Sequence, residues 1–293
     1  MNKYDAVKKM QEYIRDHLYE NVSLSDLSTV SYYSPWHSYR LFTELTGLSP
    51  SHYIRRLRLS LSALKLRDFN VRILDVALDS GYASVDGYQR AFFKEFGVNP
   101  YEYSRKPTPI GLFIPYPVSE RKEKKKMSEI KSVFVSVITK PKRKVILKRG
   151  IRAEHYFDYC AEVGCDVWGI LKSICPASEE PVCLYLPKKM IRKGTSLYVQ
   201  GVEVEENYGG PVPEGFDLID LDEAVYLMFQ GEPFEEENYG EAIENVQAAM
   251  NRYNPAGLGY RWDFENPRIQ LEPIGSRGYI ELKPVRKIGS DGR

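Results

Sequence analysis

The sequence has few of the residues that build metal sites or disulfide networks. Its 293 residues include four cysteines and four histidines, and no two cysteines form a Cys-x-x-Cys pair. All four cysteines fall in one region, which favours partly buried free thiols over a zinc site or a disulfide framework. The four are Cys160, Cys165, Cys175 and Cys183. Ser-His-Asp spacing and a glycine-rich phosphate loop are also missing, so we expect no metal, no cofactor and no catalytic residue.

Long hydrophobic runs are missing as well. No apolar stretch approaches the roughly 20 residues that span a bilayer, and the N-terminus has no basic-then-apolar leader. We therefore expect a cytoplasmic protein that does not enter a membrane. Hydrophobic residues at 43% and charged residues at 28% are typical of soluble globular proteins, and the length suits two domains.

A net charge of +1 conceals an uneven distribution along the chain. Lysine and arginine exceed aspartate and glutamate by 3 in residues 1–110 and by 9 in residues 111–150, whereas residues 151–293 carry a net charge of −11. Because contacts to nucleic-acid phosphates need cations, the acidic part is a poor candidate for them. It could favour cationic ligands, although solvated surface acid is the commoner explanation.

One stretch, residues 73–103, is typical of two short helices joined by a tight turn. Apolar residues recur on one stripe of residues 73–79, and Gly81 then breaks the helix because glycine readily adopts a left-handed turn. Ser84 is a typical N-cap for the second helix, which carries inward aromatic residues at spacings of four and ends at Gly97. The pattern predicts a helix-turn-helix whose second helix is sized for a DNA major groove; a hairpin that only packs is the alternative.

This stretch resembles the second helix-turn-helix of AraC/XylS-type transcription regulators. Ten residues carry the resemblance in order: Ala77, Gly81, Tyr82, Ser84, Arg90, Phe92, Lys94, Gly97, Pro100 and Tyr103. The resemblance implies a bacterial regulator with an all-α tandem helix-turn-helix domain, which we place at residues 1–106. It also implies double-stranded promoter DNA and RNA polymerase as partners.

A first helix-turn-helix is predicted upstream of the other. Ser34 caps its second helix and Pro35 takes the first helical position. Tyr32 stands where the family usually has a small turn residue, so we expect a wide or strained turn. Residues 51–66 then form one continuous helix rich in arginine. In the resembled family this helix is a rigid spacer that places both recognition helices in successive major grooves on one face of the DNA.

The candidate DNA contacts follow from position along the two recognition helices. Arginine can bind guanine with two hydrogen bonds, aromatic rings contact thymine methyl groups, and a carboxylate accepts from cytosine. The candidate base contacts are Trp36, Tyr39, Arg40, Val85, Asp86, Gln89 and Arg90. The candidate phosphate contacts are Ser34, Arg55, Arg56 and Ser84. An outward arginine that is only solvated is the alternative.

Residues 107–130 are predicted to be a linker. Residues 105–130 contain four prolines, and the basic run at 121–126 cannot bury a core. The basic run could add non-specific affinity for DNA, and a solvated hinge is the alternative.

Residues 131–288 are predicted to form an α+β domain built from a duplicated β-α-β-β unit. Residues 133–150 suggest a hairpin-like strand pair, followed by a helix at about 155–174 and strands at 182–186 and 197–205. A second round predicts a strand at 224–230, a helix at about 236–253, and strands at 268–272 and 279–285. Residues 144–150 align with 224–231 at an offset of about 80. Both helices would lie on one face of the sheet, leaving the opposite face concave and available.

The duplicated pattern resembles the GyrI-like effector domain of some bacterial regulators. The resemblance implies a small-molecule effector, cationic or aromatic, held between the repeats by aromatic rings and a buried glutamate. Strand alternation places Tyr279, Glu281 and Lys283 on one face. The candidate ligand contacts are Trp168, Tyr198, Tyr226, Trp262, Tyr279 and Glu281. Core packing is the alternative for the aromatic residues, and an ion pair with Lys283 or a nearby arginine is the alternative for Glu281.

Together these features predict a sequence-specific DNA-binding transcription regulator, not an enzyme, that is controlled by a small molecule. The alternative is that the GyrI-like domain hydrolyses a small molecule while tethered to a DNA-binding module. In that case a carboxylate such as Glu281 would act as the base, because His155 is the only histidine beyond residue 110.

Overall fold

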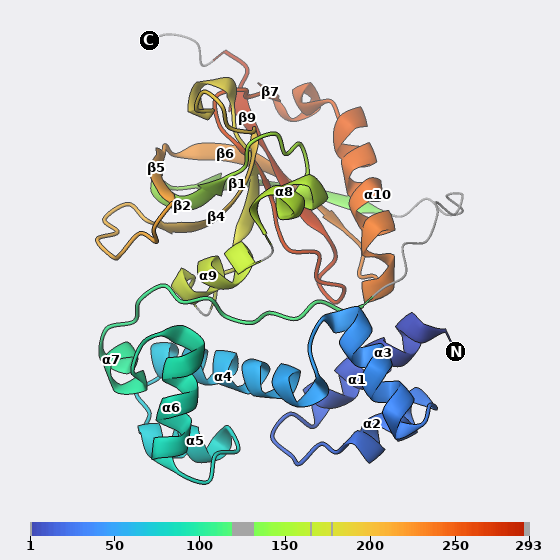
Figure 1. The fold of residues 1–293 in the computed structure, drawn as a ribbon. Coiled ribbons are helices and arrows are strands. Elements are labelled where there is room, and N and C mark those ends of the chain that lie inside the picture. The colour runs from blue at the N-terminus through green and yellow to red at the C-terminus, as the bar shows by residue number, and fades with distance from the viewer. Residues whose placement is uncertain (1, 119–131, 165, 177, 290–293) are drawn as a thin grey trace. The chain divides into compact units, whose positions relative to one another are not determined.

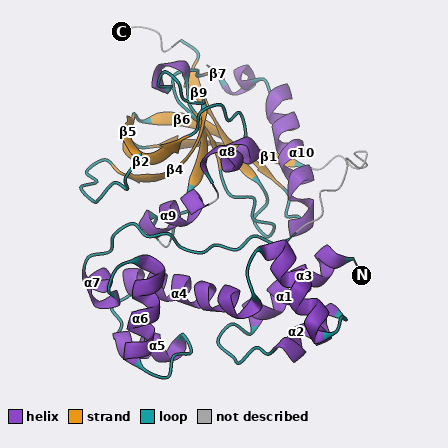
Figure 2. Cartoon of the chain, in the orientation of Figure 1, coloured by secondary structure: helices purple, strands orange, loops and turns teal. Residues whose placement is uncertain are grey.

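The computed structural model describes residues 2–118, 132–164, 166–176 and 178–289. The chain divides into two compact units, Met1–Lys126 and Met127–Arg293 (Figure 1). The described part of the first unit is helical, and the strands all belong to the second unit (Figure 2). Within the described residues, no helix is both long enough and apolar enough to cross a bilayer.

The first unit contains two helix-turn-helix pairs, as predicted. Side-chain caps explain where its helices begin: Ser23 and Asp26 form a reciprocal capping box at α2, and the Oγ atoms of Ser34 and Ser84 accept from backbone N–H groups at the starts of α3 and α6. The helices are α1 (Lys3–Asp16), α2 (Leu24–Ser31), α3 (Pro35–Thr46), α4 (Pro50–Asp68), α5 (Ile73–Asp79), α6 (Val85–Phe96) and α7 (Pro100–Arg105).

Helix α4 joins two separate hydrophobic cores. Its first half contributes Tyr53 and Ile54 to a core formed with α1, α2 and α3. Its second half contributes Leu59, Ala63 and Leu66 to a core formed with α5, α6 and α7. One continuous helix therefore fixes the two pairs relative to each other, which confirms the continuous helix predicted at residues 51–66.

The turn of the first pair is strained, as predicted. Tyr32 ends α2 in the left-handed conformation, with φ of 57° and ψ of 25°. Among the described residues it is the only non-glycine residue with a positive φ. This conformation costs an L-residue roughly 1–2 kcal/mol, which glycine avoids.

Residues 107–118, hereafter the strap, pack against the first unit although they belong to the predicted linker. Ile110 and Leu112 are buried in the second core. The N–H of Phe113 donates to Ser60 Oγ at 2.8 Å, and the N–H of Val118 donates to Gln11 Oε1 at 2.8 Å. Apolar residues between the prolines give this segment a buried side that its proline content concealed. Residues 119–130, with the basic run, lie outside the described residues.

The second unit contains one antiparallel sheet whose strand order repeats on either side of its centre. The path through the described residues is β1-β6-β9-β8-β3-β4-β2-β5, and β7 also pairs with β9. Outward from the centre, β8-β9-β6-β1 mirrors β3-β4-β2-β5. The strands are β1 (Val133–Lys140), β2 (Arg143–Arg149), β3 (Val182–Tyr185), β4 (Tyr198–Glu205), β5 (Asp217–Leu221), β6 (Ala224–Gly231), β7 (Tyr260–Trp262), β8 (Arg268–Gln270) and β9 (Ile280–Lys287).

The predicted hairpin at residues 133–150 is wrong. β1 pairs with β6, whereas β2 pairs with β4 and β5, so β1 is the first strand in the strand order and β2 is next to last. Only two residues connect β1 to β2, and only two connect β5 to β6. Two residues reach at most about 11 Å. The sheet must therefore curl until its two ends approach each other.

The curl fills the face that was predicted to be concave and available. Val145, Leu184, Tyr226 and Leu282, from four different strands, belong to one buried cluster on this face. The guanidinium of Arg143 on β2 reaches across the ends of the sheet to the Tyr226 hydroxyl, at 3.4 Å. This face is the interior of a barrel-like sheet and is occupied by apolar side chains, so that prediction is wrong.

Helices cover the outer face of the sheet. They are α8 (Tyr156–Val163), α9 (Asp166–Ile174) and α10 (Tyr239–Arg252), and three short 3₁₀ segments span Lys188–Met190, Glu236–Asn238 and Pro255–Leu258. The single helix predicted at 155–174 is two helices, because α8 ends at Gly164 with φ of 95°. α8 and α9 pack on β4, whereas α10 packs on β6, β1 and β9.

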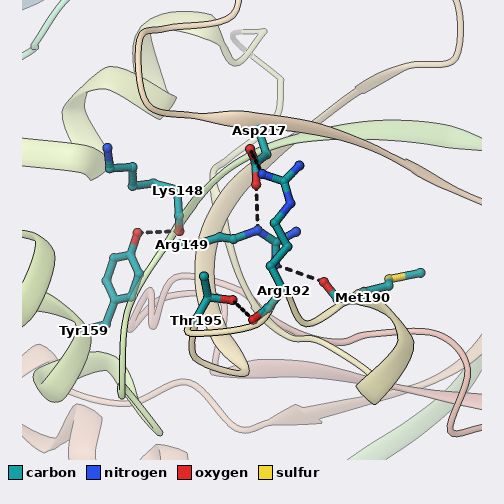
Figure 3. A network of polar contacts seen from close by, with 7 residues as sticks. All are labelled: Lys148, Arg149, Tyr159, Met190, Arg192, Thr195 and Asp217. Atoms are coloured by element: carbon teal, nitrogen blue, oxygen red, sulfur yellow. Dashed lines mark hydrogen bonds and ion pairs between the residues drawn. The ribbon is translucent and has the colours of Figure 1, made fainter.

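A polar network ties the end of β2 to its neighbours (Figure 3). Arg149 Nε donates to Asp217 Oδ2 on β5 at 2.6 Å, and its Nη1 donates to the Met190 carbonyl at 3.0 Å. Arg192 Nη1 donates to the other oxygen of Asp217 at 2.7 Å. The network anchors the loop between β3 and β4 against the edge of the sheet.

Candidate DNA interface and candidate ligand site

The first recognition helix, α3, exposes the side chains predicted to read bases. Trp36 is 68% exposed and stacks on Tyr39, with ring centroids 5.7 Å apart and planes 6° apart. Arg40 is exposed beside them. Trp36 and Tyr39 form a flat apolar surface that suits thymine methyl groups, and Arg40 adds a donor pair for guanine.

The second recognition helix, α6, exposes Asp86 and Arg90, and leaves Gln89 half-buried. Val85 packs against the second core instead, so less of it is free to contact DNA. Phe93 is 59% exposed and lies one turn beyond Arg90 on the same stripe of the helix. Phe93 was not predicted from the sequence, although its spacing from Asp86 and Arg90 indicates the same helix face.

Two neighbouring arginines on α4 have different surroundings. Arg55 is exposed. Arg56 Nε lies 2.6 Å from Glu95 Oε1, and its guanidinium lies 4.8 Å from the ring centroid of Phe113 in the strap. Much of the charge of Arg56 is therefore balanced inside the first unit, which favours Arg55 as the phosphate contact.

Arg58, also on α4, contacts the segment after α1 and lies against the turn of the second helix-turn-helix pair. Its Nε donates to the Leu18 carbonyl at 2.6 Å and its Nη2 to the Glu20 carbonyl at 2.7 Å. Its Nη1 lies so close to the turn of the second pair that a Cβ on Gly81 would be 2.6 Å from it. Arg58 thus braces the segment after α1 against the turn between α5 and α6.

In the second unit, polar side chains cross the centre of the outer sheet face. A buried row runs over four adjacent strands in register, through Gln200, Cys183, Gln270 and Glu281. A second row beside it contains Tyr198, Tyr185 and Arg268. We call these residues the polar rows. Cross-strand neighbours on one face have Cβ atoms about 5 Å apart, so each row is a continuous surface.

Glu281 is the centre of the buried row. Its carboxylate is fully buried, and Oε1 accepts from Gln270 at 2.8 Å, from Gln247 of α10 at 2.7 Å, and from the Tyr279 hydroxyl at 2.7 Å. Burial, and then the charge of Glu281, raise the pKa of Tyr279, so this hydroxyl remains a donor. The Tyr279–Glu281 hydrogen bond confirms that the two share a face.

Two cations in or beside the second row lie against aromatic rings. The guanidinium carbon of Arg268 lies 4.0 Å from the ring centroid of Tyr185, and Arg268 Nε lies 3.0 Å from Glu281 Oε2. The Lys283 ammonium lies 4.0 Å from a ring centroid of Trp262. Burial, and then the nearby charge of Arg268, lower the pKa of Lys283. The ion pair foreseen as the alternative for Glu281 is therefore made, by Arg268.

The predicted ligand residues divide between the two faces. Tyr198, Tyr279, Glu281 and Trp262 lie in or beside the polar rows. Tyr226 lies on the other face, in the apolar interior. Trp168 is buried in α9, on the helical side. Five residues that complete the rows were not predicted as ligand contacts: Cys183, Tyr185, Gln200, Arg268 and Gln270. Only the strand pairing, which the sequence did not show, brings them together.

Comparisons with known proteins bear on the first unit. A helix-turn-helix domain family model matches residues 27–106. The chain is 36% identical over 107 residues to the right origin-binding protein of Escherichia coli K12, and it spans only 37% of that protein's length. It is 32% identical over 103 residues to the regulatory protein SoxS of Salmonella typhimurium, which is 35% of this chain and 96% of SoxS.

Among solved structures, the chain is similar to a probable AraC family transcriptional regulator from Rhodopseudomonas palustris. The two are 23% identical, with a TM-score of 0.33, over 34% of this chain and 95% of the other. The helix-turn-helix model falls on the two helix pairs described above, and the match to SoxS covers nearly all of that protein. The chain therefore belongs to the AraC-type helix-turn-helix family.

Proposed function

We propose that the protein is a transcription regulator that reads promoter DNA with α3 and α6 together. The observation that carries this proposal is the placement of two N-capped helices with exposed reading side chains at the two ends of α4. α4 has 19 residues, which corresponds to about 28 Å of helix. This length is close to the ~34 Å between successive major grooves on one side of DNA.

Substitution of one arginine on each recognition helix tests the proposal. Arg40→Ala and Arg90→Ala should each weaken binding to a selected specific site by about 1–3 kcal/mol, because each removes a donor pair from a base edge. Each variant should also lose protection over a different half of the footprint. Arg15→Ala, at an exposed arginine on α1, is the control and should leave the footprint unchanged. Unchanged footprints in both recognition-helix variants would contradict a two-helix reader.

We further propose that the second unit binds a small-molecule effector at the polar rows. A buried carboxylate next to half-buried aromatic rings, those of Tyr185 and Trp262, suits a cationic or aromatic ligand. Three hydrogen bonds already engage Oε1 of Glu281, which supports a binding role for this residue rather than proton transfer. Such a ligand controls transcription only if its affinity differs between two states of the protein, through either DNA engagement or contact with RNA polymerase.

A binding series with tetraphenylphosphonium and ethidium tests the effector proposal. Glu281→Gln should weaken the binding of these cations to the full-length protein, because the variant loses the buried negative charge while the nearby aromatic rings remain. Tyr226→Phe, on the opposite sheet face, is the control and should bind as the wild type does. Equal affinity in Glu281→Gln would remove Glu281 from the site. We expect the protein to act in the cytoplasm, where promoter DNA lies.

A further inference from the structure

Arg268 is held on two sides in the way that a bound planar cation is held. One face of its guanidinium lies 4.0 Å from the ring centroid of Tyr185. Its Nε lies 3.0 Å from Oε2 of Glu281. An aromatic face and a carboxylate are the two features that together stabilise a flat, delocalised cation.

The fit between Arg268 and Glu281 is poor in spite of the short distance. Neither Arg268 Nε nor Glu281 Oε2 has a hydrogen-bond partner among the described residues. At the far end of the same row, Gln200 Oε1 is also buried and has no hydrogen-bond partner there. A buried acceptor without a donor is costly, so these oxygens favour a ligand that brings N–H groups with better alignment.

The exposed fractions of the Arg268 and Glu281 side chains indicate which of the two must move first when a ligand binds. Glu281 is fully buried, whereas the side chain of Arg268 is 26% exposed. A long arginine side chain can rotate toward solvent and keep its charge hydrated. A ligand that reaches Oε2 must therefore displace the guanidinium first.

Charge decides which ligands can make this exchange. If Arg268 rotates away, Glu281 loses its ion-pair partner and becomes a buried anion that a bound cation can neutralise. An anionic ligand would be repelled by the carboxylate. A neutral ligand would leave the carboxylate without a counter-ion. A planar cation restores both the stacking on Tyr185 and the ion pair.

We infer that Arg268 is an internal occupant of a cation site formed by Tyr185 and Glu281, and that planar cations with N–H donors bind there by displacing its guanidinium. This inference rests on the proposed binding of an effector by the second unit. It makes Arg268 the residue that sets ligand affinity, because every ligand competes with a side chain that is always present.

Calorimetric titration of the full-length protein with benzamidinium, a planar aromatic cation, tests the inference. Arg268→Ala should bind benzamidinium at least tenfold more tightly than the wild type, since the competing group is gone. Arg268→Met should shift affinity in the same direction while it keeps the aliphatic stem, so it replaces the alanine variant if that variant folds poorly by circular dichroism. Adding Glu281→Gln to either variant should abolish the gain.

Arg277→Ala is the matched control. Arg277 also pairs with a glutamate, Glu180, and its side chain is 29% exposed, but it lies outside the polar rows. This variant should bind benzamidinium as the wild type does. The inference would be overturned by equal affinity in the wild type and both Arg268 variants, or by a gain that survives Glu281→Gln. It would also be overturned by benzoate binding to the wild type that is lost in Arg268→Ala, since Arg268 would then be an anion receptor.

A parallel measurement separates this inference from the proposed regulatory function. DNA affinity of Arg268→Ala is measured with and without saturating benzamidinium. Tight binding of benzamidinium without any change in DNA affinity would leave the cation site intact and refute effector control. Effector control by other molecules, with no gain in Arg268→Ala, would refute the cation site alone.

Discussion

Replacement of Gly81 by alanine tests whether Arg58 braces the segment after α1 against the turn of the second helix-turn-helix pair. Gly81 has φ of 80°, a conformation that disfavours any side chain. An added Cβ would lie 2.6 Å from Arg58 Nη1, so the guanidinium must move. It can move only by weakening its hydrogen bonds to the carbonyls of Leu18 and Glu20.

The magnitude follows from two separable contributions. The left-handed conformation costs alanine about 1–2 kcal/mol, and a gain of roughly 0.4–1 kcal/mol from the less flexible unfolded chain offsets part of it. Gly97→Ala should show this contribution alone, about 1 kcal/mol, because Gly97 has φ of 71° and no heavy atom within 4 Å of an added Cβ. Gly81→Ala also weakens the charge-assisted hydrogen bonds of Arg58. This should add about 1–2 kcal/mol to the cost of the substitution, and not more, since the partly exposed guanidinium regains contacts with water.

Urea unfolding of a fragment spanning residues 1–118, followed by far-ultraviolet circular dichroism, measures both contributions. Gly81→Ala should lower the free energy of unfolding by about 2–3 kcal/mol, and the excess over Gly97→Ala should disappear in an Arg58→Ala background. If Gly81→Ala costs the same with and without Arg58, the steric argument fails. If it costs no more than Gly97→Ala, the brace contributes nothing to stability.

Three further predictions concern other parts of the chain. Gln11→Ala should destabilise the same fragment by about 1–3 kcal/mol in urea, because Gln11 makes the hydrogen bonds that hold the end of the strap; no change would show that apolar contacts suffice. Arg149→Met should lower the stability of the full chain in thermal unfolding by about 1–3 kcal/mol, because it removes the buried partner of Asp217 (Figure 3). Arg192→Met, at an exposed partner of the same aspartate, should cost under about 1 kcal/mol. The reverse order of the two costs would contradict the network. Burial acts to raise the pKa of Asp263, but hydrogen bonds from Asn266 and other donors hold the pKa below its usual range. The stability that this carboxylate contributes is present above about pH 4 and is lost as pH falls. Asp263→Asn should therefore flatten the acid side of a plot of unfolding free energy against pH. An unchanged plot would refute this prediction.

The first unit was predictable from local patterns because its information is local. N-caps such as Ser34 and Ser84, and glycine at helix ends, act within four residues of their position. Apolar spacing then predicted the core faces of each helix. The strap was missed for a related reason: its packing depends on distant residues, including Gln11 and Ser60, and proline content gave the opposite indication.

The second unit was less predictable because its structure depends on strand pairing. Alternation correctly placed Tyr279 and Glu281 on one face, but it could not show that β1 pairs with β6 rather than with β2. The pairing also decides which side chains meet Glu281. Arg268 and Tyr185 come from strands that are far apart in sequence, and no periodicity in either strand indicates the other.

The curl of the sheet determines where a polar ligand site can lie in the second unit. Two-residue connections at both ends force the inner face closed, and apolar side chains fill it. Buried polar groups there would have neither water nor helix side chains to satisfy them. On the outer face, α8 and α9 pack on β4 and α10 packs on β6, β1 and β9, with an apolar cluster beneath each side. The central strands β3 and β8 lie between these clusters. There Gln247 of α10 can donate to Glu281 on the neighbouring strand β9, and Arg268 on β8 can reach water. The position of the polar rows is therefore a consequence of the strand order.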